Sequence, residues 1–135
     1  MGCAKDCFHP EEEDGLLITL MKSEGAIPFV KTAVPQQLLI NETNSWCFGY
    51  GKNPHNLARS CGGSSGGEAG LIALGCSPLG YGSDGAGSVR IPCLCCGIYG
   101  FKPTYKRTTM TGHKVLYKTW NIAAVGGTLG TCVED

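Results

Sequence analysis

The sequence predicts an α/β fold, because a helical segment passes almost directly into a strand-type segment near the start of the chain. Leu16, Leu17, Leu20 and Met21 recur at the spacing of one helix face. The run 26–30 (AIPFV) follows at once, and its continuous apolar character is typical of a buried strand. A helix followed closely by a strand is the alternation typical of a layered α/β fold.

The remaining elements are predicted from their boundaries. Pro10 suits the first position of the first helix, the acidic run 11–14 favours the positive end of its dipole, and Gly25 is a natural stop. A loop is predicted over 41–60, and no element is predicted beyond Thr104. Between them the sequence predicts a helix over 66–74, a strand over 78–81, a tight loop over 82–88, a helix over 89–96 with Pro92 in its first turn, and a strand over 98–102.

Length and charge limit the class of protein. The 135 residues are the size of one domain, and we expect a single domain over 1–135. Lys plus Arg number 11 and Asp plus Glu number 11, so the formal net charge is zero, which argues against a nucleic-acid partner. The longest uncharged stretches, 69–83 and 119–133, are too short for a transmembrane helix. The acidic start lacks the apolar segment of a signal peptide, and the chain is predicted to be intracellular.

The cysteines do not predict a disulfide framework or a metal site. There are nine of them, an odd number at irregular spacing. Cys93, Cys95 and Cys96 are too crowded for a standard zinc pair. We therefore expect reduced cysteines that serve as small apolar residues, and no metal.

Two short glycine motifs suggest enzyme classes. Residues 80–85 (GYGSDG) fit the dinucleotide pattern G-x-G-x-x-G, but 94–117 contains no Asp or Glu where a ribose-binding acid is needed. Residues 62–66 (GGSSG) fit the nucleophile turn G-x-S-x-G, and Ser64, Asp84 and His113 follow the order serine, acid, histidine. The segment before Gly62 is not a buried strand, so this triad is kept as an alternative.

A longer pattern is more specific than either motif. The segments 62–68 (GGSSGGE), 78–80 (PLG), 82–92 (GSDGAGSVRIP) and 96–104 (CGIYGFKPT) together closely resemble the signature of the amidase signature family. The segments 24–32 and 34–36 look most like its fatty-acid amide hydrolase branch. The resemblance implies part of the amidase signature fold, a mixed β-sheet core flanked by helices that is incomplete in this chain.

The resemblance also implies a serine hydrolase that cleaves amide bonds with a Ser-Ser-Lys triad and no cofactor. Ser88 falls on the nucleophile, and Ser64 falls on the bridging serine, which has a cis peptide bond in the family. Ser65 falls on a supporting serine, and Asp84 and Arg90 fall on positions that hold the loop. The implied oxyanion hole consists of the backbone N–H groups of Gly85, Ala86, Gly87 and Ser88.

These residue types suit the chemistry. A nucleophilic serine needs a base within hydrogen-bond reach, and a lysine acts as one only where burial keeps it neutral. A bridging serine relays the proton between the two and later to the leaving amine. Adjacent backbone N–H groups that converge on one oxygen are worth about 3–4 kcal/mol each in the transition state.

The sequence departs from the family pattern at the catalytic base, the lysine of the triad. The family lysine aligns ahead of Met1, and none of Lys5, Lys22, Lys31 and Lys102 takes its place. Ala86 stands where the family usually has glycine, and we expect its Cβ to crowd a loop that needs a positive φ. The family's Gly-Pro and Asn-Pro dipeptides are replaced at 126–131 and 44–45.

Family members are also several times longer than this chain. We expect a truncated signature region without the rest of the sheet, the acyl channel or the membrane anchor, and therefore no activity of this chain alone. If active, it takes a lipid amide as substrate, and the resemblance implies association with membranes. The alternative is an inactive homologue, either the product of a decaying gene copy or a chain that pairs with a full-length relative.

Overall fold

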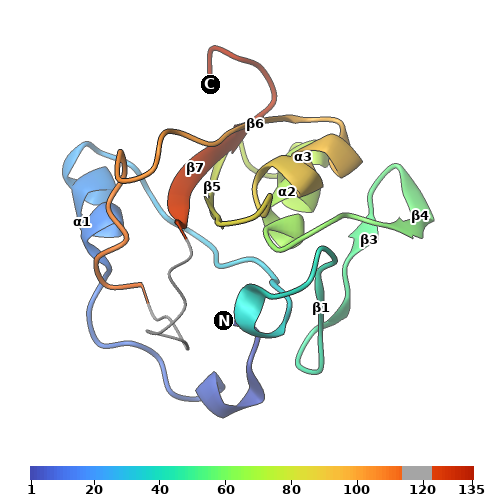
Figure 1. The fold of residues 1–135 in the computed structure, drawn as a ribbon, viewed down its shortest axis with the longest axis horizontal. Coiled ribbons are helices and arrows are strands. Elements are labelled where there is room, and N and C mark those ends of the chain that lie inside the picture. The colour runs from blue at the N-terminus through green and yellow to red at the C-terminus, as the bar shows by residue number, and fades with distance from the viewer. Residues whose placement is uncertain (114–122) are drawn as a thin grey trace.

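The computed structural model describes residues 1–113 and 123–135, and these form a small α/β structure (Figure 1). The predicted fold class is confirmed. The helices are η1 (Ala4–Asp6), α1 (Leu16–Ser23), η2 (Gln36–Leu38), α2 (Gly66–Ala73) and α3 (Arg90–Cys96). The strands are β1 (Asn44–Ser45), β2 (Gly49–Tyr50), β3 (Lys52–Asn53), β4 (Asn56–Ser60), β5 (Leu79–Asp84), β6 (Tyr99–Phe101) and β7 (Val125–Gly130).

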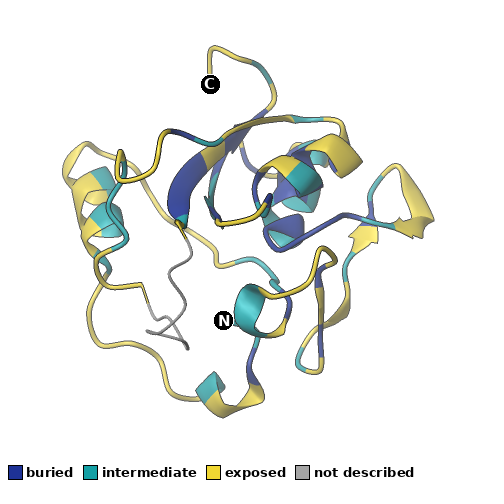
Figure 2. Ribbon diagram, in the orientation of Figure 1, coloured by how far each residue is buried: buried dark blue, intermediate teal, exposed yellow. Residues whose placement is uncertain are grey.

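The core lies between the helix pair α2 and α3 and a three-stranded sheet. The strand order is β5-β7-β6, and both pairs are antiparallel. Figure 2 shows the buried residues concentrated in β7 and where the two helices face the sheet. The core side chains are those of Cys61, Ala69, Ile72, Val89, Cys93, Cys96 and Leu129.

Glycines in the outer strands let the helices approach the sheet. Gly80 of β5 and Gly100 of β6 both pair with Leu129 of β7. A Cβ at Gly100 would lie 2.5 Å from the Cys93 sulfur, and one at Gly80 would lie 2.6 Å from the Ile72 Cδ1 atom. The high glycine content therefore reflects close packing of helices on strands.

Helix α1 ends where the sequence predicted but begins later. Gly25 has a φ of +92°, and the Ala26 N–H donates to the Met21 carbonyl, which closes the helix. The predicted start at Pro10 is wrong, because the helix begins at Leu16. The backbone of Gly15 is extended, and the Leu16 N–H donates to the carbonyl of Thr111, so a contact with a distant segment sets the start.

The predicted buried strand over 26–30 is also wrong. This segment has no strand structure, and all five residues are exposed, with Ile27 84% exposed. Among the described residues no strand pairs with it, and an apolar run without a ladder partner cannot form a sheet. The predicted loop over 41–60 instead contains two small antiparallel pairs, β1 with β2 and β3 with β4.

The second half of the chain follows the prediction more closely. Helices α2 and α3 and strand β6 lie within a residue or two of their predicted bounds, and Pro92 is the third residue of α3. Strand β5 continues to Asp84, two residues beyond the start of the predicted loop, because Ser83 and Asp84 pair with Gly126 and Val125. The partner strand β7 was not predicted.

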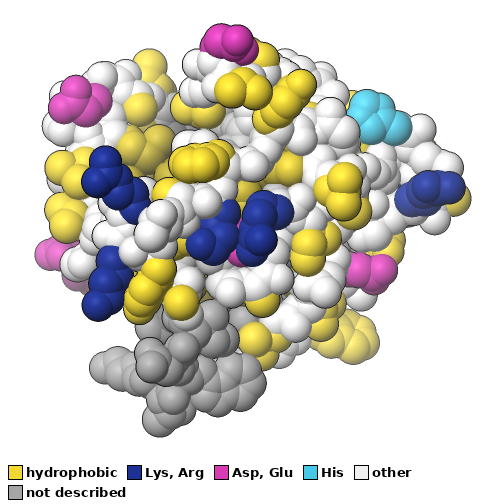
Figure 3. Space-filling model, turned by 45° about the horizontal axis from the view of Figure 1, so that its top comes forward, with side chains coloured by type: hydrophobic (Ala, Val, Ile, Leu, Met, Phe, Trp, Pro, Cys, Tyr) yellow, Lys and Arg dark blue, Asp and Glu magenta, His cyan; other side chains and the backbone are white. Residues whose placement is uncertain are grey.

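One face of the three-stranded sheet carries no helix of residues 1–113 and 123–135. Leu79, Tyr99 and Phe101 are 41%, 55% and 66% exposed there, and they line a shallow hollow with Thr128 and Val133. Figure 3 shows hydrophobic side chains at several separate places on the molecular surface. No helix of the described residues is both long enough and apolar enough to span a bilayer.

Candidate active site

Two serine-bearing loops meet beside the core. The Ser65 N–H donates to the Ser88 carbonyl oxygen at 3.0 Å, which joins the loop before α2 to the loop before α3. The Ser65 side chain packs over β5, where a Cβ at Gly82 would lie 2.4 Å from its Oγ atom. The structure therefore brings Ser64, Ser65 and Ser88, which are 24 positions apart at most, into one region.

The loop that carries Ser64 is buried and is held by Thr43, a residue outside the loop. Ser64 is 1% exposed, and the peptide bond between Gly63 and Ser64 is cis, as the resemblance implied. Thr43, itself 1% exposed, donates its Oγ1 proton to the Gly62 carbonyl at 2.9 Å and accepts from the Gly66 N–H at 3.0 Å. The single hydroxyl of Thr43 thus fixes both ends of the serine loop.

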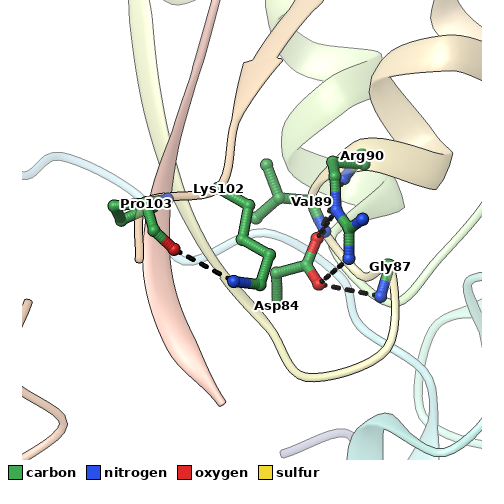
Figure 4. A network of polar contacts seen from close by, with 6 residues as sticks. All are labelled: Asp84, Gly87, Val89, Arg90, Lys102 and Pro103. Carbon is green, nitrogen blue, oxygen red and sulfur yellow. Dashed lines mark hydrogen bonds and ion pairs between the residues drawn. The ribbon is translucent and has the colours of Figure 1, made fainter. Parts of the chain in front are cut away.

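The loop that carries Ser88 is organised by a buried carboxylate (Figure 4). The Asp84 side chain is fully buried and accepts hydrogen bonds from the Arg90 Nε and Nη2 atoms at 3.0 and 2.9 Å. It also accepts the backbone N–H groups of Gly87, Val89 and Arg90 at 2.8, 3.1 and 3.3 Å. Asp84 therefore caps α3 and fixes the loop from 84 to 90.

These contacts decide the ionisation of Asp84. Burial by itself would raise the pKa of the carboxyl group. The hydrogen bonds from Arg90 and from the three backbone N–H groups outweigh burial and lower the pKa to about 2. Asp84 is consequently a carboxylate at neutral pH and holds the loop as an anion.

The four expected oxyanion donors are not equivalent. The Gly87 N–H donates to Asp84 Oδ1, whereas the N–H groups of Gly85, Ala86 and Ser88 have no acceptor in the described part of the chain. The expected crowding at Ala86 is wrong, because its φ is not positive and its side chain is exposed. The positive φ of the loop, +123°, lies at Gly87.

The alternative triad of Ser64, Asp84 and His113 is not assembled. Both oxygens of Asp84 are engaged by Arg90 and by backbone N–H groups of its own loop, and His113 is not among its partners in residues 1–113 and 123–135. His113 instead lines a surface hollow with Tyr105, Thr109 and Met110.

No described lysine bonds to either serine. Lys102 donates to the Pro103 carbonyl at 3.0 Å, and Lys22 pairs with Asp14 (Figure 4 shows the first contact). No hydrogen bond joins the hydroxyls of Ser64 and Ser88 within the described residues. The same residues contain no cluster of His, Cys, Asp and Glu side chains suited to a metal ion.

Comparisons with known proteins cover almost all of the chain. The family model described as Amidase matches residues 1–135. The chain is 43% identical over 134 residues to vitamin D3 hydroxylase-associated protein of Gallus gallus, covering 99% of this chain and 28% of the relative. It is 44% identical over 114 residues to fatty-acid amide hydrolase 1 of Sus scrofa, covering 84% of this chain and 20% of the relative.

Solved structures agree with the sequence relatives. A fatty acid amide hydrolase structure superposes with a TM-score of 0.85 and 34% identity, covering 90% of this chain and 21% of that one. A 6-aminohexanoate cyclic dimer hydrolase gives a TM-score of 0.85 and 35% identity, covering 93% of this chain and 26% of that one. The chain thus spans between a fifth and just over a quarter of the length of these relatives.

Proposed function

Because the chain belongs to the amidase family, we propose that Ser88 is the nucleophile of an amide-hydrolysing site and that Ser64 is its bridging serine. The observation that carries the proposal is the hydrogen bond from the Ser65 N–H to the Ser88 carbonyl, which couples the two serine loops. The burial of Ser64 and the partial exposure of Ser88 suit their separate roles. A relay serine works shielded from water, whereas a nucleophile must meet the substrate.

The loop geometry suggests how the transition state is stabilised. Ser88 attacks the amide carbonyl, and the N–H groups of Gly85, Ala86 and Ser88 are the donors left to receive the oxyanion. Asp84 holds the Gly87 N–H and the start of α3, so the loop is fixed before substrate binds. Asp84, Arg90 and Ser65 act as positioning residues in this proposal.

The proton path needs a base that the proposal places outside these 135 residues. Ser88 passes its proton to Ser64 and onward to a lysine, and Ser64 returns a proton to the leaving amine. No described lysine bonds to Ser64 or Ser88. The chain spans 20–28% of the two curated relatives compared above, so complete turnover is proposed for a protein that also contains the lysine.

The proposed substrate class is the amide of a fatty acid. Support comes from the named relatives, since fatty-acid amide hydrolases of Sus scrofa and Caenorhabditis elegans are 44% and 45% identical to this chain over 114 and 111 residues. A second candidate is an inactive homologue, favoured because no described lysine donates a hydrogen bond to Ser64 or Ser88. The two differ in whether Ser88 reacts with an acyl donor.

The proposal is tested with acyl donors that differ in leaving group. A nitrophenyl ester expels a stable anion, so its leaving group needs no proton from Ser64. The leaving amine of an amide must receive a proton. We expect the purified chain to release a burst of about one nitrophenolate per protein from a long-chain fatty acyl ester, with no turnover of the corresponding amide. The burst should be absent in Ser88→Ala and unchanged in Ser83→Ala.

Four results would decide against all or part of the proposal. A burst that persists in Ser88→Ala excludes Ser88 as the nucleophile, and one that disappears in His113→Ala favours the Ser-Asp-His triad. No burst from a folded chain supports the inactive homologue. An equal burst from acetyl and long-chain esters leaves the nucleophile in place but removes the fatty-acyl preference.

A further inference from the structure

Two cysteines far apart in the sequence have their sulfur atoms in contact on the surface. Cys7 follows η1, and Cys47 lies in the turn between β1 and β2. Their Sγ atoms are 3.5 Å apart, and both side chains are partly exposed. Among the described residues, no other hydrogen bond joins two cysteine sulfurs.

The two sulfurs are near each other but farther apart than in a disulfide bond. Bonded sulfur atoms lie about 2.05 Å apart, so the two sulfurs must approach by about 1.5 Å. Each sits in an irregular segment, Cys7 at the end of a short helix and Cys47 in a three-residue turn, where small side-chain and backbone adjustments suffice. The neighbouring Cys7 sulfur raises the pKa of Cys47, which disfavours the Cys47 thiolate, so the first attack on an oxidant is assigned to Cys7.

We propose that Cys7 and Cys47 are a redox modification site, which a peroxide converts into a disulfide between the N-terminal segment and the β1–β2 hairpin. One thiolate attacks the peroxide oxygen, breaks the O–O bond and becomes a sulfenic acid. The second thiol then displaces the sulfenic oxygen as water and forms the S–S bond. With hydrogen peroxide, two thiols and one peroxide give one disulfide and two water molecules.

The disulfide would reinforce the support of the serine loop. It closes a loop from residue 7 to residue 47 that contains Thr43, the residue that holds both ends of the Ser64 loop. The hairpin is fastened beside Thr43 by the hydrogen bond from the Gly51 N–H to the Thr43 carbonyl at 2.6 Å. Cross-linking so long a loop should raise the melting temperature by on the order of 10 °C. The inference is independent of the proposed hydrolase activity.

Peptide mapping tests the site directly. The purified chain is treated with hydrogen peroxide, its remaining thiols are alkylated, and it is digested with trypsin without reduction. Cleavage after Lys5, Lys22, Lys31 and Lys52 places Cys3, Cys7 and Cys47 in separate peptides, 1–5, 6–22 and 32–52. We expect the peptides 6–22 and 32–52 to be linked, and the oxidised chain to melt at the higher temperature.

Two variants serve as controls. Cys47→Ser should lose both the linked peptide and the melting shift, whereas Cys76→Ser, which changes an exposed cysteine elsewhere, should keep both. The proposal is overturned if Cys7 and Cys47 stay alkylatable while Cys76 is oxidised. It is equally overturned if either cysteine links to Cys3 in preference to the other.

Discussion

Replacing Asp84 by asparagine should lower the free energy of unfolding by about 3 kcal/mol at neutral pH. The carboxylate is fully buried and accepts five hydrogen bonds from Arg90, Gly87 and Val89. Asparagine offers one acceptor oxygen, and its NH2 group faces N–H donors that then have no partner. Urea unfolding of the variant and the parent chain measures the loss.

A surface ion pair provides the control for Asp84. Asp14 pairs with Lys22, and their side chains are 46% and 51% exposed. Asp14→Asn should therefore cost less than about 1 kcal/mol. Equal losses in the two variants would contradict the structural role assigned to Asp84.

The same carboxylate predicts a pH dependence of stability. The pKa of Asp84 in the folded chain, about 2, lies below its ordinary value of 3.8. A lowered folded-state pKa stabilises the protein above the unfolded pKa, and this contribution, about 2 kcal/mol, is lost as the pH falls from about 4 to about 2. The parent chain should lose this increment in acid and Asp84→Asn should not, so parallel acid titrations of the two would contradict the assignment.

Replacing Gly67 by alanine should cost about 3 kcal/mol of folding free energy. The Gly67 N–H donates to the Ala33 carbonyl at 3.2 Å, and an added Cβ would lie 2.4 Å from that oxygen and 2.6 Å from the Ala33 nitrogen. Backbone atoms cannot rotate away as a side chain can. The segment around Ala33 must therefore separate from α2, which follows directly after the Ser64 loop.

Gly70 of the same helix is the matched control. A Cβ there meets no atom within 4 Å other than its chain neighbours and the backbone of its own helix. Gly70→Ala should therefore stabilise the chain by about 0.5–1 kcal/mol, because alanine loses less backbone entropy in a helix. Thermal unfolding of both variants separates the effect of the contact with Ala33 from that of helix propensity. Equal stability of the two variants would contradict the steric role assigned to the Ala33 contact.

The elements that the sequence predicted correctly are those with local signals. Gly25 closes α1, Pro92 fits the first turn of α3, and the glycine-serine loop leads into α2. The errors arose where a distant segment decides the structure. Thr111 sets the start of α1, and β7 extends β5 to Asp84, although neither contact has a signal in the local sequence.

The residues of the candidate site also fall into those with a local sequence signal and those placed by distant contacts. The signature segments point to Ser64, Ser65, Asp84 and Ser88, which are the residues of the two joined loops. Thr43 was missed, because its contacts with Gly62 and Gly66 span 19 and 23 positions and it lies in a segment predicted only as a loop. The sequence also did not show that the Gly87 N–H, unlike the other expected oxyanion donors, already donates to the Asp84 side chain. That contact is visible only in the structure.

The most direct test of the account is to locate the adduct of a fluorophosphonate by mass spectrometry. The account predicts one adduct, on Ser88, that forms faster as the pH is raised, because no described lysine bonds to Ser88 and hydroxide then has to remove its proton. Ser88→Ala should remove it and His113→Ala should leave it unchanged. An adduct on Ser64 that His113→Ala abolishes, or no adduct on the folded chain, would contradict the claim that Ser88 is the nucleophile.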